Sequence, residues 1–207
     1  MKHKNILKAF LLSLAAFGLT AAARADDPAP VPISGSMGLL GQSYAGLTYS
    51  YINLDGASSH SDDYHFDYNE PLNAGFDGTF SYDWTQTGSF AKQQSVLVAL
   101  RAFSTSHLWG KPYVEAGGGY TWARVAGGKD NSFLWEAAAG VEFQVAPAVV
   151  VTPFVQYRDA PDLAGNATWN FGVKANYWVN SQWSVTGGIS RNDNEDTAFT
   201  VGTNFRF

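Results

Sequence analysis

Apolar and polar residues alternate with a period of two over most of this chain, and this pattern limits the fold more than any other feature. In residues 197–207 every second position is Phe, Val or Thr, and the positions between them are small or polar. Because successive side chains of a β-strand point to opposite faces, the pattern predicts a strand with one apolar and one polar face. The same alternation recurs in the segments 75–84, 132–145, 167–179 and 182–191.

The low charge of the alternating segments distinguishes between two kinds of β protein. A soluble β-sandwich also alternates, but its solvent-facing side should carry more charge. Only 15% of this chain is charged, against about 25% in an ordinary soluble domain, and aromatic residues make up another 15%. We therefore favour a transmembrane β-barrel, in which the apolar face meets lipid and the polar face lines the lumen.

The number of strands follows from the positions of the chain ends. Nine segments alternate clearly, which would leave the two ends on opposite sides of a membrane, whereas single-chain bacterial barrels have even strand numbers. The segment Tyr64–Leu72, followed by a tight turn at Asn73-Ala74-Gly75, is the best tenth strand. Eight strands is the alternative, if two weak N-terminal segments merge or are lost. The other nine predicted strands are 42–53, 75–84, 92–104, 112–124, 132–145, 148–158, 167–179, 182–191 and 197–207.

The connections between these strands predict the orientation of the barrel. Those at 146–147 and 180–181 are very short, and those at 125–131, 159–166 and 192–196 are longer and polar. Short periplasmic turns and longer outer loops are typical of bacterial barrels, so we expect both chain ends in the periplasm.

The N-terminal residues predict export. Lys2, Lys4 and Lys8 precede the apolar run 9–19, and Ala23-Arg24-Ala25 forms an A-x-A cleavage box. This is the pattern of a secretory signal peptide, and the run is too short to span a bilayer. We expect a cleaved signal peptide at 1–25, a flexible leader rich in Pro, Gly and Ser at 26–41, and the barrel at 42–207.

The charge of the exported chain excludes one class of partner. Cleavage would remove four of the 13 basic residues and leave nine against 18 acidic ones, a net charge of −9. Nucleic acid binding needs a basic face, so we expect no nucleic acid partner. The chain has no cysteine, so its stability must come from hydrogen bonding and packing.

Three stretches carry a resemblance to a known family. The sequences KPYVEAGGGYTW at 111–122, WEAAAGVEF at 135–143 and FRF at 205–207 are similar to those of small outer-membrane β-barrels of the opacity and OmpA-type superfamily. The resemblance implies a bacterial outer-membrane protein in contact with lipid and lipopolysaccharide. It also implies that the barrel assembly machinery recognises a C-terminal signal, here Phe199, Val201, Phe205 and Phe207. The superfamily contains adhesins, structural anchors, small channels and a few enzymes, so function stays open.

Six charged residues take inward parity in the predicted barrel. Arg101 and Glu115 lie at similar distances on either side of the turn near residue 107, so they should face each other on adjacent strands. Because unpaired charges in a narrow lumen are costly, three acids and three bases predict a paired network that closes the lumen. The alternative is a gate or selectivity ring in a small porin-like channel. The six residues are Asp77, Arg101, Glu115, Glu142, Lys174 and Arg206.

No residue pattern supports catalysis well. The stretch His60–His65 lies near the top of the first hairpin, where barrel proteases carry Asp and His, but no second site of that kind occurs in the C-terminal strands. A surface hydrolase built on His60, Asp62 and His65 is therefore the least favoured reading. We expect a monomeric, non-enzymatic protein without a cofactor or a metal. Most aromatic residues near strand ends fit a membrane-interface girdle, but Trp178 has inward parity.

Overall fold

The computed structural model describes residues 38–57, 59–89, 91–107, 110–125, 128–163 and 167–207. Within these ranges no helix is long and apolar enough to cross a membrane. The described residues form ten strands: β1 (Tyr44–Asn53), β2 (His60–Asn73), β3 (Phe76–Thr87), β4 (Ala91–Phe103), β5 (Lys111–Val125), β6 (Gly128–Ala146), β7 (Val149–Asp159), β8 (Thr168–Trp178), β9 (Trp183–Asn192) and β10 (Thr197–Arg206).

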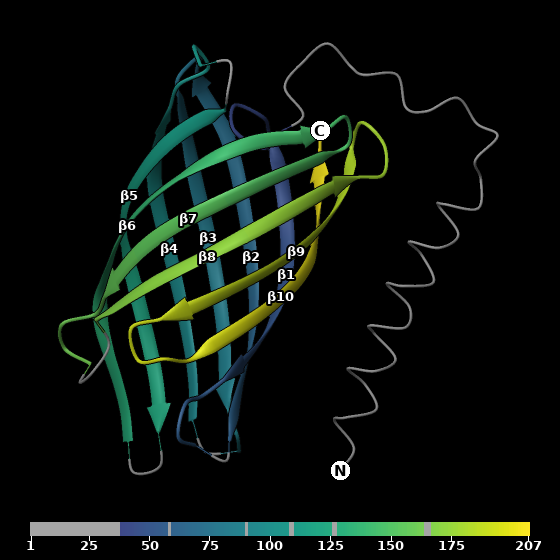
Figure 1. The fold of residues 1–207 in the computed structure, drawn as a ribbon. Coiled ribbons are helices and arrows are strands. Elements are labelled where there is room, and N and C mark those ends of the chain that lie inside the picture. The colour runs from purple at the N-terminus through teal and green to yellow at the C-terminus, as the bar shows by residue number, and fades with distance from the viewer. Residues whose placement is uncertain (1–37, 58, 90, 108–109, 126–127, 164–166) are drawn as a thin grey trace. The chain divides into compact units, whose positions relative to one another are not determined.

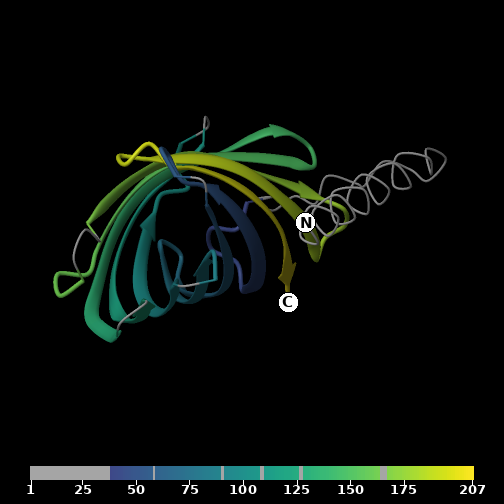
Figure 2. The same cartoon turned by 90° about the horizontal axis from the view of Figure 1, so that it is seen from below.

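The ten strands form a closed antiparallel barrel. Each strand pairs with its neighbours in sequence, and β1 pairs with β10 over its whole length, which leaves no free sheet edge. The strands run obliquely, so that β7 and β8 cross in front of β3 and β4 in Figure 1, and they follow one another around the wall in Figure 2. The ten-strand prediction is confirmed, and the eight-strand barrel and the sandwich are both wrong.

Several strands are longer than the sequence predicted. The strand β2 begins at His60 rather than at residue 64, and β6 begins at Gly128 rather than at residue 132. The polar loop expected at 125–131 is thus mostly the end of a long hairpin. A membrane crossing needs about 9–11 residues, and β6 has 19. The residues at this end of β6 therefore extend beyond the membrane, where polar side chains meet water.

We call the end where β1 begins and β10 ends the terminal end, and the other the opposite end. The connections after β2 and β6 lie at the terminal end and contain two residues each. The connection after β8, at the same end, was predicted at 180–181 and contains the four residues 179–182. However, the connection between β4 and β5 at that end has seven residues, and the one between β5 and β6 at the opposite end has two. The two ends therefore differ less in loop length than expected.

The two faces of the wall differ as the alternation requires. Outward-facing Val98 and Phe133 are 63% and 55% exposed, whereas inward-facing Asp77 and Thr121 are fully buried. Inside the barrel, Leu97, Ala99 and Leu134 form a small apolar cluster with Ala160. Polar groups therefore occupy most of the interior and apolar groups most of the exterior, the reverse of a soluble protein.

Candidate functional site

The lumen contains a cavity of about 430 Å³. Its wall includes Leu39 and Tyr44 at the terminal end, and Ile52 and Asp196 near the opposite end. Charged and hydroxyl side chains from all parts of the wall face it, so the candidate functional site is the lumen itself.

Arg101 and Glu115 form an ion pair in the cavity wall. They are direct cross-strand partners on β4 and β5, and the Arg101 Nε–Glu115 Oε2 distance is 2.5 Å. The guanidinium carbon lies 5.4 Å from the centre of the Tyr113 ring, within the range of a cation–π contact. Both charges are thus neutralised against the wall.

A second charged group crosses the lumen. His65 and Asp83 are partners on β2 and β3, and Glu136 and Arg158 are partners on β6 and β7. Asp83 accepts a hydrogen bond from Arg158 Nη2 at 2.5 Å and lies 2.5 Å from His65 Nδ1. Arg158 Nε lies 3.5 Å from Glu136. Since β3 and β7 are four strands apart in the ring, this bridge joins opposite walls.

The six charges predicted from the sequence do not include this cross-lumen bridge. The alternation in the sequence gives inward parity to His65, Asp83 and Glu136. The same alternation in the segment 148–158 gives inward parity to Arg158. The missing information was the width of the barrel, which decides whether Asp83 and Arg158 meet across the lumen.

The terminal end of the lumen holds the segment Gly38–Ser43, which we call the inner segment. Glu142 accepts hydrogen bonds from the backbone N–H groups of Leu39 at 2.8 Å and Leu40 at 3.3 Å. Asp77 accepts one from Gly41 N–H at 3.0 Å. Consecutive backbone N–H groups form a natural binding site for anions, and here two buried carboxylates of the wall occupy it.

Cationic and amide side chains hold the carbonyl groups of the inner segment. Arg206 donates to the Gly38 carbonyl at 2.7 Å, Lys111 to the Leu40 carbonyl at 3.3 Å, and Asn69 to the Gln42 carbonyl at 2.8 Å. Residues 38–41, which the sequence assigned to the end of a flexible leader, are therefore fixed against the wall.

Apolar contacts complete this closure. Leu39 packs against Val150 and Trp178, which are both nearly fully buried. The Arg206 guanidinium carbon lies 4.1 Å from the centre of the Trp178 ring. The inward parity of Trp178 thus has a physical reason, because its ring supports both the inner segment and Arg206.

The six residues predicted as one charge network fall into three settings. Arg101 and Glu115 pair with each other, whereas Asp77, Glu142 and Arg206 bond to the backbone of the inner segment. Lys174 lies over the Phe154 ring at 5.2 Å. Among the described residues, then, only one pair within the six is an ion pair, and backbone groups take the place of the expected countercharges.

The residues of the hydrolase hypothesis do not converge. His60 Nε2 lies 3.5 Å from Asp62, and Asp62 accepts a hydrogen bond from Tyr49 at 2.6 Å on the outer face. His65 points into the lumen and contacts Asp83. The described residues also contain no cluster of His, Asp and Glu that could hold a metal ion.

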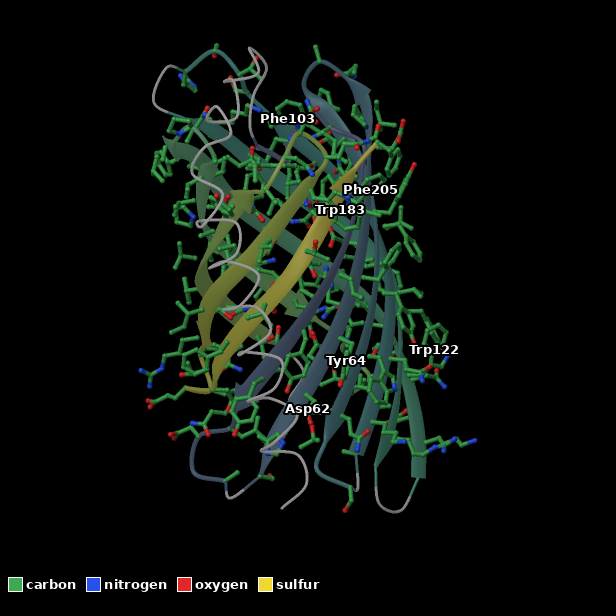
Figure 3. All side chains as sticks on the ribbon, turned by 90° about the vertical axis from the view of Figure 1, so that its right-hand side faces the viewer. Asp62, Tyr64, Phe103, Trp122, Trp183 and Phe205 are labelled. Atoms are coloured by element: carbon green, nitrogen blue, oxygen red, sulfur yellow. The ribbon has the colours of Figure 1, made fainter. Side chains whose placement is uncertain are left out.

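Aromatic side chains form two belts on the exterior. Near the opposite end, neighbouring ring centres lie 4.9–5.3 Å apart, and near the terminal end the Trp183 and Phe205 rings lie 4.8 Å apart. Figure 3 shows Trp183 and Phe205 at one level of the barrel and Tyr64 and Trp122 at the other. The rings near the opposite end include Tyr49, Tyr64, Trp84, Trp135, Tyr157 and Trp169.

The distance between the belts matches a membrane. On β8, Trp169 and Tyr177 are eight positions apart, and both side chains are exposed. At about 3.4 Å per residue and a tilt of about 45°, these residues span roughly 20 Å along the barrel axis. Outer-membrane barrels carry an apolar band about 25 Å tall between aromatic girdles.

The predicted C-terminal signal lies on β10 and just beyond it. Phe199 and Phe207 are 52% and 60% exposed on the outer face. The Phe207 ring stacks on Tyr68 at 6.0 Å, next to the strand junction that closes the barrel. Recognition of these residues by assembly machinery stays a prediction.

Closed pairing, an apolar exterior between aromatic belts and a polar lumen define a ten-stranded transmembrane β-barrel of the outer-membrane type. No protein-family model matches the sequence, and no curated protein matches it.

Solved structures with a similar fold are small outer-membrane barrels. The KdgM porin in complex with disordered oligogalacturonate is 12% identical, with a TM-score of 0.47 over 78% of this chain and 99% of that one. Neisserial surface protein A is 14% identical, with a TM-score of 0.47 over 80% and 96% of the two chains. The NanC porin is 8% identical, with a TM-score of 0.49 over 78% and 100%. At these values the fold assignment rests on the strand pairing, and no role is transferred.

Proposed function

We propose that this chain is a non-enzymatic outer-membrane β-barrel with a structural or surface-interaction role, and that its lumen is closed to solutes. The observation that carries this proposal is the inner segment. Its backbone is bonded to Glu142, Asp77 and Arg206, so it occupies the terminal end of the lumen. The bridge from Asp83 to Arg158 narrows the lumen further along.

The proposed orientation puts the terminal end in the periplasm. An exported chain with a signal peptide inserts from the periplasmic side, and an even strand number returns its C-terminus to that side. The long β5–β6 hairpin then extends outward from the cell, where barrels carry their larger protrusions. The outer aromatic belt meets lipopolysaccharide, and the barrel is a monomer assembled through its C-terminal strand.

Conductance in planar bilayers tests the closed lumen. We expect no discrete current steps from the wild-type barrel. Steps that change in size after Arg101→Ala would show that ions pass the Arg101–Glu115 pair, and the closed-lumen proposal would then be wrong. Circular dichroism and heat-modifiable gel mobility of both proteins provide the control for folding.

A small channel for ions or small solutes is the second candidate, favoured by the size of the cavity. Its wall carries six carboxylates, against the three cations Arg101, Arg158 and Lys174 besides His65. Such a wall attracts cations, so a conducting barrel should have a reversal potential that favours K⁺ over Cl⁻ in a salt gradient. Anion preference would contradict this version of the channel. The six carboxylates are Asp63, Asp67, Asp83, Glu115, Glu136 and Asp196.

A further inference from the structure

The basic residues of the barrel are distributed unevenly between its two faces. Nine Lys and Arg residues lie beyond the predicted cleavage site. Five face the lumen or the inner segment, and of the four on the outer face Arg191 pairs with Glu195 at 2.9 Å. The remaining three, Lys92, Arg124 and Lys129, lie side by side, and we call them the basic row.

Strand register fixes the geometry of the basic row. Lys92 on β4 is the direct partner of Arg124 on β5, and Arg124 is the direct partner of Lys129 on β6. All three are exposed, and all share the outward parity of Trp122. Side chains directly opposite on neighbouring strands have Cβ atoms about 5 Å apart. Three positive charges therefore form a continuous line across three strands.

No carboxylate interrupts this line. Among the residues that the structure describes, none of the three forms an ion pair, and the next residue of the same row, on β3, is Gln86. The first acid in the row is Asp62 on β2, which is already bonded to Tyr49. Because like charges directly opposite each other are destabilising, the row favours a ligand with closely spaced negative charges.

The aromatic belt fixes the depth of the row. On β5, the outward-facing residue next to Arg124 on the membrane side is Trp122. The centres of the Trp122 and Tyr120 rings lie 5.1 Å apart. The Tyr120 hydroxyl bonds to Asn131 on β6. Arg124 is two residues further out, which is about 7 Å along the strand and about 5 Å along the axis. Since Trp and Tyr lie at headgroup level, the three cations lie beside the headgroups of the outer leaflet.

We propose that Lys92, Arg124 and Lys129 bind the phosphate groups of a lipopolysaccharide headgroup. The guanidinium of Arg124 takes a phosphate through paired hydrogen bonds, and the two flanking ammonium groups act as point charges. The aromatic belt below lies at the interface where the headgroups meet the acyl chains. This inference rests on the outer-membrane placement and the orientation proposed above, but it is independent of whether the lumen conducts.

Native mass spectrometry of the full mature chain in detergent micelles tests the site, with bis-phosphorylated lipid A as the probe. Each charge near an anionic surface contributes about a fivefold change in affinity, so replacing all three residues with Gln should weaken binding by about a hundredfold. Arg124→Gln alone should weaken it about fivefold, while the matched control Arg191→Gln leaves it unchanged. Replacing Lys92 and Lys129 with Arg should preserve binding.

Three results would overturn the proposal. One is equal loss of lipid A in Arg124→Gln and Arg191→Gln. Another is binding of phosphatidylcholine as tight as that of lipid A. The third is full displacement by inorganic pyrophosphate at equal concentration, because it would identify a soluble anion rather than the lipid as the ligand. Gel mobility of each variant checks that the barrel has folded, and bilayer conductance tests the closed lumen separately.

Discussion

Replacing Glu142 with Gln should loosen the inner segment without unfolding the barrel. The Glu142 carboxylate is 6% exposed and accepts the N–H groups of Leu39 and Leu40. A hydrogen bond to a charged group contributes about 1.5–3 kcal/mol to stability, against about 1 kcal/mol for a bond between neutral groups. Gln keeps one acceptor oxygen but directs an NH₂ group toward two N–H donors, so we expect a loss of about 1.5–3 kcal/mol in the docking of the segment.

Amide hydrogen exchange measures this loss directly. At 1.4 kcal/mol for a factor of ten, protection of the Leu39 and Leu40 amides should fall about 10- to 150-fold, if exchange follows undocking of the segment. Amides in the middle of β5 should keep their protection, because the barrel ladder is intact. The Leu39 and Leu40 rates can be read by NMR in detergent micelles.

Glu136→Gln is the matched control for this prediction. Glu136 is also a nearly buried carboxylate of β6, but it lies beside Arg158 and has no contact with the inner segment. Its replacement should leave the Leu39 and Leu40 exchange rates unchanged. If Glu142→Gln also leaves both rates within a factor of two of wild type, the carboxylate does not hold the segment and the reasoning is wrong.

Three further outcomes test other parts of the structure. Asp83→Ala should lower the free energy of unfolding in urea by about 1.5–3 kcal/mol, because it removes a charge-assisted hydrogen bond from the partly buried Arg158 and leaves it with a weaker partner; a loss below 1 kcal/mol would argue against the bridge. Gly119→Val should prevent refolding into micelles, seen as lost heat-modifiable mobility, because a Cβ there would overlap the Val96 carbonyl oxygen; normal refolding would contradict this. Deleting Phe207 should lower the yield of assembled barrel in cells while leaving refolding in detergent intact. Equal yields from the variant and the wild type in cells would show that Phe207 is not part of an assembly signal.

Local rules were enough to predict much of this fold. Alternation located the ten strands, and parity alone assigned Asp77, Arg101 and Glu115 to the lumen. Pairs such as Arg101 and Glu115 could be predicted because two strands of one hairpin are held in register by the turn between them. Strand limits were less accurate, since polar residues continue a strand beyond the membrane without interrupting its hydrogen bonds.

The candidate site depended on contacts that no local rule describes. Arg158 meets Asp83 because the circumference of the closed barrel brings β7 and β3 within reach of each other. Glu142 binds Leu39 and Leu40, about a hundred residues away in sequence. Nothing in the Pro- and Gly-rich stretch before β1 predicts this, because its partners lie on strands far along the chain.

The sequence alone therefore determined the two-faced strands, their even number and the polar character of the lumen, because strand geometry converts alternation directly into faces. Only the tertiary structure decided which inward charges meet and what closes the terminal end of the lumen. The same division holds on the outer face. The sequence contains Lys92, Arg124 and Lys129 as three separate residues, and only the register of β4, β5 and β6 brings them into one row beside the aromatic belt.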